Sequence, residues 1–364
     1  MSAPVTARTP HTPIGRVVGL ALALAVVVGV IVLAFAWPSV TAEPHDLPVA
    51  IAGPAASVAA VEDALDDKQP DVFAFVEVDD RDAAVAAIEQ REVYGALVLS
   101  DQSGIAPEVL TSSAANLAVS QLLTGVGSAL EAQINAQATA AAAAAGGPAP
   151  AHITVTVTDV VPLADTDPRG TGLTAAMFPL VMGGMIGGIA ISIVVIGAMR
   201  RVLAVVVYSA VGGVILAGIL HGWFGVLQGD FWAEAAVVAL SLSAIAAPIT
   251  GAVAVLGRAG IAVGPIVMML FANPISGAAM PREFLPGVWG QVGQWFPPGA
   301  AANLLRSVSY FPAADMTFSW LVLIGWTVGG LLLSVVGHFR TAGGAEPDAL
   351  AAHEDDPVPT PVAV

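Results

Sequence analysis

Long apolar stretches alternate with polar stretches along the chain, and this pattern predicts its organisation. Residues 17–36 (VVGLALALAVVVGVIVLAFA) form an uncharged run of 20 residues. About 20 apolar residues in a helix span the hydrocarbon core of a bilayer. Residues 37–170 are more polar, and the chain turns apolar again after Arg169. This last part predicts five more spans, at about 173–199, 202–221, 232–256, 260–279 and 318–338.

The first apolar run has two interpretations. The basic flank at Arg8 and Arg16 and the small residues Ala34 and Ala36 are typical of a cleaved signal peptide. The run is longer than the usual apolar part of about 7–15 residues, which favours an uncleaved anchor. Neither interpretation changes the expected topology of the rest.

Basic residues next to the spans predict the orientation, because arginine and lysine accumulate on the cytoplasmic side. We expect a multi-pass protein of the plasma membrane with both termini cytoplasmic and residues 37–170 outside. The loop 280–317 carries Arg282 and Arg306 on the outer side and is the one discordance. With six spans, the cytoplasmic side receives Arg8, Arg16, Arg200, Arg201, Arg258 and Arg340.

The segment between the first two spans alternates between strand-like and helical patterns. Strand-like runs at 48–53, 72–78 and 93–99 are separated by amphipathic patterns at 55–68 and 80–91. This alternation predicts a small α/β domain with a partly parallel sheet. Within it, Asp80 is a candidate N-cap.

The second half of this domain predicts one long helix and one strand. An alanine-rich helix is expected over 113–145, ending at Gly146-Gly147-Pro148, followed by an alternating strand over 152–161. The helix carries a weak apolar stripe, which either packs on the sheet or pairs with a second copy. The members of that stripe are Leu117, Leu122, Val126, Leu130 and Ile134.

Composition narrows the class of protein. Only 11% of the residues are charged, against about 25% in soluble domains, which excludes an ordinary soluble enzyme. The net charge of −16 disfavours a nucleic-acid partner. Residues 37–170 hold most of that charge, with 19 acidic and 4 basic residues. The acids lack the ligand spacing and glycine turn of a calcium loop, so we interpret them as a solvated face.

Several kinds of catalytic site are missing from the sequence. The single lysine, Lys68, is not part of a GxxxxGK[ST] phosphate loop, and neither HExxH nor GxSxG occurs. No cysteine is present, and we expect no metal or cofactor in this chain. The predicted spans carry no carboxylate near their centres, which disfavours a self-sufficient ion-coupled transporter.

One segment, 271–311, carries a resemblance to a known family. It reads FANPISGAAMPREFLPGVWGQVGQWFPPGAAANLLRSVSYF and resembles the permeases of type-two ABC exporters, most of all the phage-infection-protein branch and its actinobacterial relatives. REVYGAL at 91–97 and DPRG at 167–170 look similar to the family as well. The motif residues are Asn273, Pro274, Ser276, Gly277, Pro281, Leu285, Pro286, Trp295, Pro297, Pro298, Arg306 and Tyr310.

The sequence pattern predicts a polytopic α-helical membrane protein with six spans and an inserted extracytoplasmic α/β domain, and the family layout fits this prediction. The implied organisation is a cytoplasmic segment 1–16, a first transmembrane helix 17–36, the α/β domain 37–170, a five-span membrane domain 171–340 with outer interfacial helices 280–311, and a disordered acidic tail 341–364. Trp289, Trp295 and Phe296 suit the interfacial depth.

The family also implies partners and a function. Such permeases dimerise, as homodimers or with a related permease, and are driven by a separate cytoplasmic ATP-binding subunit. This chain is then expected to export a hydrophobic or amphipathic substrate without being an enzyme itself. The expected contacts with the ATPase are the loops carrying Arg16, Arg200, Arg201 and Arg258. The alternative is a non-transporting surface receptor or a scaffold of a secretion or envelope complex, which the α/β domain favours.

Overall fold

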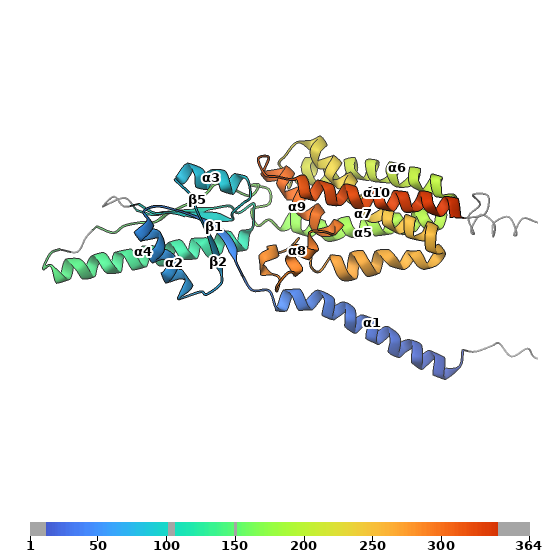
Figure 1. The fold of residues 1–364 in the computed structure, drawn as a ribbon, viewed down its shortest axis with the longest axis horizontal. Coiled ribbons are helices and arrows are strands. Elements are labelled where there is room, and N and C mark those ends of the chain that lie inside the picture. The colour runs from blue at the N-terminus through green and yellow to red at the C-terminus, as the bar shows by residue number, and fades with distance from the viewer. Residues whose placement is uncertain (1–11, 101–105, 149–150, 341–364) are drawn as a thin grey trace, which may run out of the picture.

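The computed structural model describes residues 12–100, 106–148 and 151–340. It has an α/β region, residues 41–170, at one end and a bundle of long helices at the other (Figure 1). Most of the N-terminal segment 1–16 and the whole tail 341–364 lie outside the described residues. The predictions made for them stay predictions.

The α/β region is built on one five-stranded sheet. Its order is β2-β1-β3-β4-β5; β1 pairs in parallel with β2 and β3, β3–β4 is antiparallel and β4–β5 is parallel. The predicted partly parallel sheet is therefore present. The short β4 was missed because its four residues contain only two apolar side chains. The strands are β1 Leu47–Ala52, β2 Phe73–Glu77, β3 Gly95–Val98, β4 Glu108–Thr111 and β5 Thr156–Asp159.

Helices cover both faces of this sheet, as the apolar strands require. On one face, Val49 and Leu97 pack with helices α2, Ala55–Asp66, and α4, Leu117–Ala144. On the other, Ala50 and Ala96 pack against α3, Arg81–Glu89. The predicted cap of α3 is confirmed, because the Asp80 carboxylate accepts the N–H of Ala83 at 2.9 Å.

Helix α4 packs on the sheet only through its first half. Its buried residues are Val119, Ser120, Leu123 and Gly127, and Val126 of the predicted stripe packs against the same core. The second half extends past the sheet (Figure 1). There the Asn135 amide holds the returning chain, accepting from the N–H of Ile153 at 2.8 Å and donating to its carbonyl at 2.7 Å.

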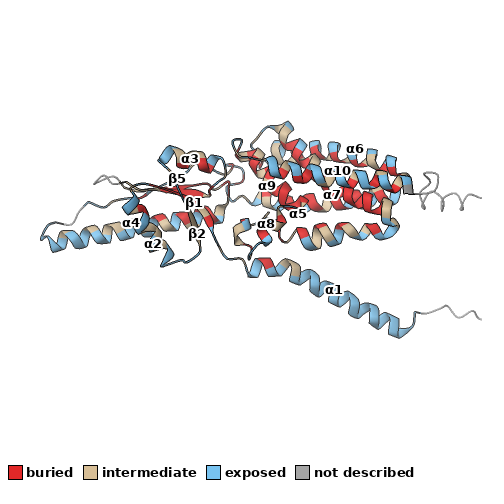
Figure 2. Ribbon diagram, viewed as in Figure 1, coloured by how far each residue is buried: buried red, intermediate tan, exposed pale blue. Residues whose placement is uncertain are grey.

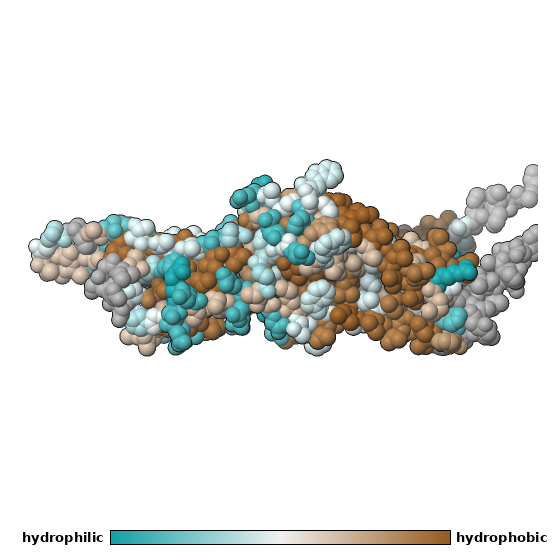
Figure 3. Space-filling view, turned by 90° about the horizontal axis from the view of Figure 1, so that it is seen from above, coloured by the Kyte–Doolittle hydropathy of each residue, from teal (hydrophilic) through white to brown (hydrophobic). Residues whose placement is uncertain are grey.

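Five helices in the described residues are long and apolar enough to cross a membrane, by length and composition. Figure 2 shows α7 buried and α1 exposed along most of its length, and hydrophobic residues dominate the surface of the bundle (Figure 3). These features define a helical protein suited to a membrane. The five are α1 Ile14–Val40, α5 Thr171–Val194, α6 Ala198–Ala217 continued by η1 Gly218–Trp223, α7 Phe231–Leu256 continued by η2 Gly257–Ala262, and α10 Thr317–Arg340.

The predicted span 260–279 is not among the five. Its residues form the 3₁₀ turn η2 and a nine-residue π-helix, η3 Gly264–Ala272, after which the chain turns at Asn273. Pro265, at the start of η3, has no N–H for a regular helical hydrogen bond. The six-span topology therefore stays a prediction.

Three glycines of α5 and α6 lie directly against α7. A Cβ on Gly184 would meet the side chain of Ile245 on α7, and one on Gly188 would meet the backbone of Ala246. A Cβ on Gly213 would meet Ala235 and Ala239. These glycines bring α5 and α6 close to α7, which is the close approach that small residues allow.

The segment between the bundle and the α/β region consists of short pieces. These are the 3₁₀ turn η4, Arg282–Phe284, and two helices, α8 Trp289–Gly293 and α9 Pro297–Tyr310. Polar residues gather on the surface at this junction and over the α/β region (Figure 3). The predicted helices of 280–311 are thus present, placed where two parts of the chain far apart in sequence meet (Figure 1).

Candidate functional site

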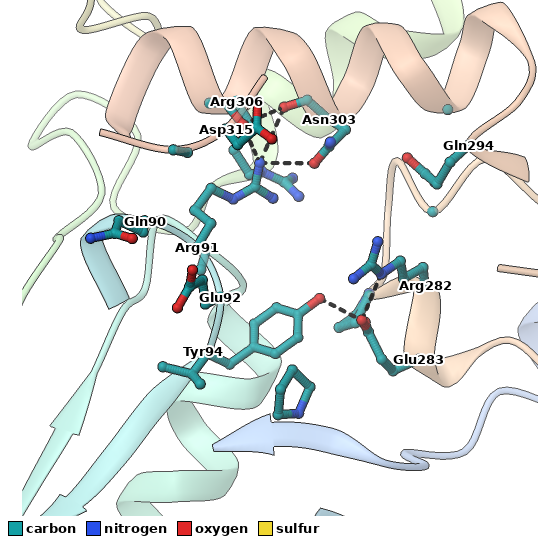
Figure 4. Close-up of a pocket in the computed structure, with 18 of the residues that line it drawn as sticks. Gln90, Arg91, Glu92, Tyr94, Arg282, Glu283, Gln294, Asn303, Arg306 and Asp315 are labelled. Atoms are coloured by element: carbon teal, nitrogen blue, oxygen red, sulfur yellow. Dashed lines mark hydrogen bonds and ion pairs between the residues drawn. The ribbon is translucent and has the colours of Figure 1, made fainter. Parts of the chain in front are cut away.

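A cavity of about 440 Å³ lies at this junction, and we call it the junction pocket. One wall is the turn between α3 and β3, and the other is formed by the Ser276–Glu283 segment and α9. Figure 4 shows Arg91 and Tyr94 reaching from the first wall towards Asn303 and Glu283 on the second. The lining is mostly polar, with three arginines among its residues.

Arg91 occupies an unusual backbone position at the end of α3. The N–H of Arg91 bonds to the carbonyl of Ile88, and the N–H of Glu92 bonds to that of Ala87, which is the Schellman pattern of a helix end. Arg91 has φ 59°, a left-handed conformation that usually takes glycine at this position. An arginine here costs about 1–2 kcal/mol of backbone free energy, which its side-chain contacts must offset.

Those contacts join the α/β region to α9. Arg91 Nη1 donates to the side-chain oxygen of Asn303 at 2.8 Å, to its carbonyl at 3.2 Å and to the hydroxyl of Ser307 at 2.5 Å. The guanidinium also lies 5.2 Å from the ring centroid of Phe311, a cation–π contact. Burial lowers the pKa of Arg91 to about 10, and the charge of Arg306 adds to the effect. Arg91 therefore remains a cation at neutral pH.

Tyr94 makes a second bridge across the junction. Its hydroxyl donates to the Glu283 carboxylate at 2.7 Å, and Arg282 Nε donates to the other oxygen of that carboxylate at 2.7 Å. Burial and the nearby negative charge of Glu283 raise the pKa of Tyr94, so the phenol stays protonated and keeps its donor. Backbone bonds from Glu43 to Phe284 and from His45 to Glu283 support the same contact.

Arg306 is the third arginine of the junction pocket, and it also lines a second cavity of about 260 Å³. Among the described residues its guanidinium has neither a hydrogen bond nor an ion pair. Burial lowers its pKa. The site therefore holds a cation whose loss of solvation no neighbouring carboxylate offsets.

Most of the predicted motif residues shape the backbone around this pocket. The Ser276 hydroxyl donates to the Asn273 carbonyl at 2.7 Å, and Gly277 has φ 67°, so this part of the motif is a turn. Pro297 and Pro298 form the first turn of α9, where a missing N–H costs nothing. Pro274 and Pro286 lie half-buried in turns, while Leu285 is fully buried.

The remaining motif residues divide between packing and the pocket. The Trp295 carbonyl accepts from the indole N–H of Trp326 at 2.9 Å, and the Tyr310 hydroxyl donates to the carbonyl of Val226 at 2.7 Å. In the DPRG motif, Asp167 accepts the N–H groups of Thr171 and Gly172 at the start of α5. The predicted residues that line the junction pocket are Ser276, Gly277, Pro281 and Arg306.

The four residues that make the side-chain contacts described above, Arg91, Tyr94, Glu283 and Asn303, were not predicted as site residues. Arg91 and Tyr94 belong to the REVYGAL segment, which contributed to the resemblance without receiving a role. One local signal was available, because an arginine rather than a glycine or asparagine ends the predicted helix 80–91. Glu283 and Asn303 carry no signal of this kind.

The four arginines predicted to contact an ATPase differ in accessibility. Arg16, Arg200 and Arg258 are exposed. Arg201 is only 2% exposed, and its Nε donates to the carbonyl of Val195 at the end of α5. Adjacent residues on a helix point about 100° apart, so Arg200 faces out while Arg201 faces in. That the loop carrying them contacts an ATPase stays a prediction.

The described residues contain no group of three or more acidic or histidine side chains placed to hold a metal ion. Comparisons with protein families, with curated proteins and with solved structures found no match to this chain. The class that the structure itself supports is a helical membrane protein with a small five-stranded sheet.

We expect Arg91→Gly to loosen the junction without unfolding the α/β region. Glycine relieves the left-handed backbone strain at this position, but it removes all three hydrogen bonds to α9. Hydrogen bonds to a charged group contribute about 1.5–3 kcal/mol each. Amide hydrogen exchange in α9 and in 276–284 should therefore rise about tenfold or more, measured on the full chain by mass spectrometry.

The control is Arg81→Gly at the start of α3, which removes a partly exposed ion pair with Glu108 on β4. This pair lies within the α/β region and makes no bond to α9, so exchange in α9 should stay at its wild-type rate. Unchanged exchange in the Arg91 variant would show that the guanidinium does not hold the two parts together.

Proposed function

We propose that the chain is the membrane permease subunit of an ABC-type exporter, driven by a separate cytoplasmic ATPase. It moves a hydrophobic or amphipathic substrate out of the cell. The observation that carries the proposal is that the two ends of the molecule differ. The α/β region lies at one end of the bundle, and the helix ends carrying Arg16, Arg200 and Arg258 lie at the other (Figure 1).

This arrangement matches the orientation in a membrane that basic residues favour, with arginine and lysine on the cytoplasmic side. The arginine-bearing end faces the cytoplasm, where it meets the ATPase, and the α/β region faces outside. The meeting of REVYGAL with α9 supports the family resemblance, because the two segments that suggested it form one junction through Arg91 and Ser307.

The bundle also offers a surface for a second permease subunit. An apolar groove of about 760 Å³ runs along α10 beside Trp295 and Trp326. Gly325 and Gly329 line it, four residues apart, and a Cβ on either would meet nothing within 4 Å. Small residues at this spacing let a second helix approach closely in lipid. The groove therefore supports a dimer.

The test is co-purification from membranes in mild detergent. An ATP-binding subunit should co-purify with the wild-type chain, identified by mass spectrometry, and efflux should require its co-expression. Reversing the exposed charges in Arg200→Glu/Arg258→Glu should remove most of that subunit, because like charges across an interface disfavour it.

The matched control is Lys68→Glu, which reverses an exposed charge on the α/β region. It should retain the ATPase subunit. If no ATPase subunit co-purifies with the wild-type chain, the exporter proposal fails, and the receptor or scaffold alternative takes its place.

A further inference from the structure

The acidic side chains that line the junction pocket do not neutralise its arginines equally. Its acids are Glu92, Glu283 and Asp315. The Glu283 carboxylate accepts from both Arg282 and Tyr94. Asp315 is exposed and accepts the backbone N–H of Thr317 at 2.9 Å. Glu92 is exposed to solvent. None of these acids forms an ion pair with Arg91 or Arg306 in the part of the chain that the structure describes.

The two remaining arginines keep donors without partners. The three hydrogen bonds of Arg91 all leave from Nη1 and reach neutral oxygens, so Nε and Nη2 make no hydrogen bond to any described residue. Arg306 makes none at all with those residues. A guanidinium has five N–H donors in a planar fork that matches the oxygens of phosphate.

The surroundings of Arg91 and Arg306 make the binding of an anion more favourable. Both arginines are partly buried, and a partly desolvated cation without a countercharge is costly. An anion between them would receive charge-assisted hydrogen bonds, about twice as strong as those between neutral groups. A pocket of 440 Å³ exceeds the size of one phosphate group and lies in the range of small-ligand sites.

From these contacts we propose that the junction pocket binds a phosphate group, held between Arg91 on the α/β region and Arg306 on α9. Two sources share this chemistry: a phospholipid headgroup and soluble phosphate. Trp289 and Trp295 are partly exposed on the segment 280–311, which also contributes to the pocket. Tryptophan is typical of the membrane interface. A headgroup could therefore reach the site. Binding would brace the α/β region against the bundle, and it does not depend on the exporter function.

The test uses the full chain in a neutral sugar-based detergent and follows thermal unfolding by tryptophan fluorescence. One arm compares sodium phosphate with sodium chloride at equal ionic strength. The other compares micelles with added phosphatidylglycerol against micelles with added diacylglycerol, which has similar acyl chains and no phosphate. A ligand that binds only the folded state raises the unfolding midpoint with its concentration.

We expect a saturable rise in the midpoint in at least one arm. A rise with phosphatidylglycerol alone identifies the headgroup as the source, and a rise with phosphate identifies the soluble anion. Arg306→Gln should weaken apparent binding about tenfold or more, which is the effect of losing one strong charge-assisted contact. Arg81→Gln, which removes a charge outside the pocket, should bind as the wild type does.

Arg306→Lys covers the case in which Arg306→Gln does not fold. Lysine keeps the charge but loses the planar fork, so binding should fall severalfold and become more sensitive to salt. Equal midpoints with each probe and its control in both arms would overturn the proposal. Wild-type affinity in folded Arg306→Gln, or in Arg306→Lys if the first variant is not obtained, would overturn it as well.

Discussion

Replacing Gly330 by alanine is expected to destabilise the helix bundle by about 3 kcal/mol, at the upper end of the usual cost of overpacking. A Cβ on Gly330 would overlap the nitrogen of Pro248 and the carbonyl carbon of Ala247 on α7. These are backbone atoms of the most deeply buried helix. They cannot rotate away as a side chain would, so α7 and α10 must separate.

The adjacent glycine supplies a matched control. A Cβ on Gly329 would meet nothing within 4 Å, and alanine is a better helix former than glycine by about 1 kcal/mol. In monomers, where no second helix lies on the groove along α10, Gly329→Ala should therefore unfold at or slightly above the wild-type midpoint, whereas Gly330→Ala should unfold well below it. Thermal unfolding of the purified full chains in detergent measures both. Equal midpoints for the two variants would show that α7 and α10 do not pack as described.

The second large effect is expected at Glu234 in the first turn of α7. Its side chain is fully buried; one oxygen accepts the N–H of Gly229 at 2.7 Å, and the other lies 2.7 Å from His221 Nδ1. Glu234→Leu leaves both partners without their acceptor. A buried donor left without its acceptor costs about 1–3 kcal/mol, and both Gly229 and the partly exposed His221 lose theirs, so the unfolding midpoint should fall by several degrees. Glu234→Gln keeps one acceptor and should lose less.

A double substitution distinguishes this pair from simple packing. His221→Leu alone strands the buried carboxylate, but Glu234→Leu with His221→Leu removes both polar groups together. Replacing both partners of a hydrogen bond by apolar residues of similar shape is often close to neutral. The double variant should therefore be more stable than the sum of the two single losses predicts. Strict additivity in thermal unfolding would contradict a direct interaction between His221 and Glu234.

The elements of the α/β region could be predicted because their signals are local. Apolar periodicity within a short window predicts strands such as β1 and β2 and helices such as α2 and α3. Asp80 predicts the start of α3. The same rule failed for β4, which has too few residues to show a period. Hydropathy also predicted one regular spanning helix over 260–279, because it does not distinguish a regular helix from the 3₁₀ and π turns seen there.

The candidate site was predicted only in part. Arg306, Ser276, Gly277 and Pro281 were recognised from one contiguous segment. Arg91, which lines the same pocket, bonds to Ser307 on α9, more than 200 positions away in the chain. No periodicity relates two residues so far apart, because their contact depends on how α3, β3 and α9 pack together.

By itself the sequence determined a protein rich in membrane-length apolar helices, most of the strands and helices of its α/β region, and the arginines near the helix ends. These follow from solvent transfer and from backbone periodicity, both of which act within a few residues. Only the tertiary structure decided that Gly330 and not Gly329 meets α7, that Arg201 turns inward beside an exposed Arg200, and that Arg91 and Arg306 share one pocket. Each of these depends on which side of a helix faces a neighbour, and that direction is set when the helices pack.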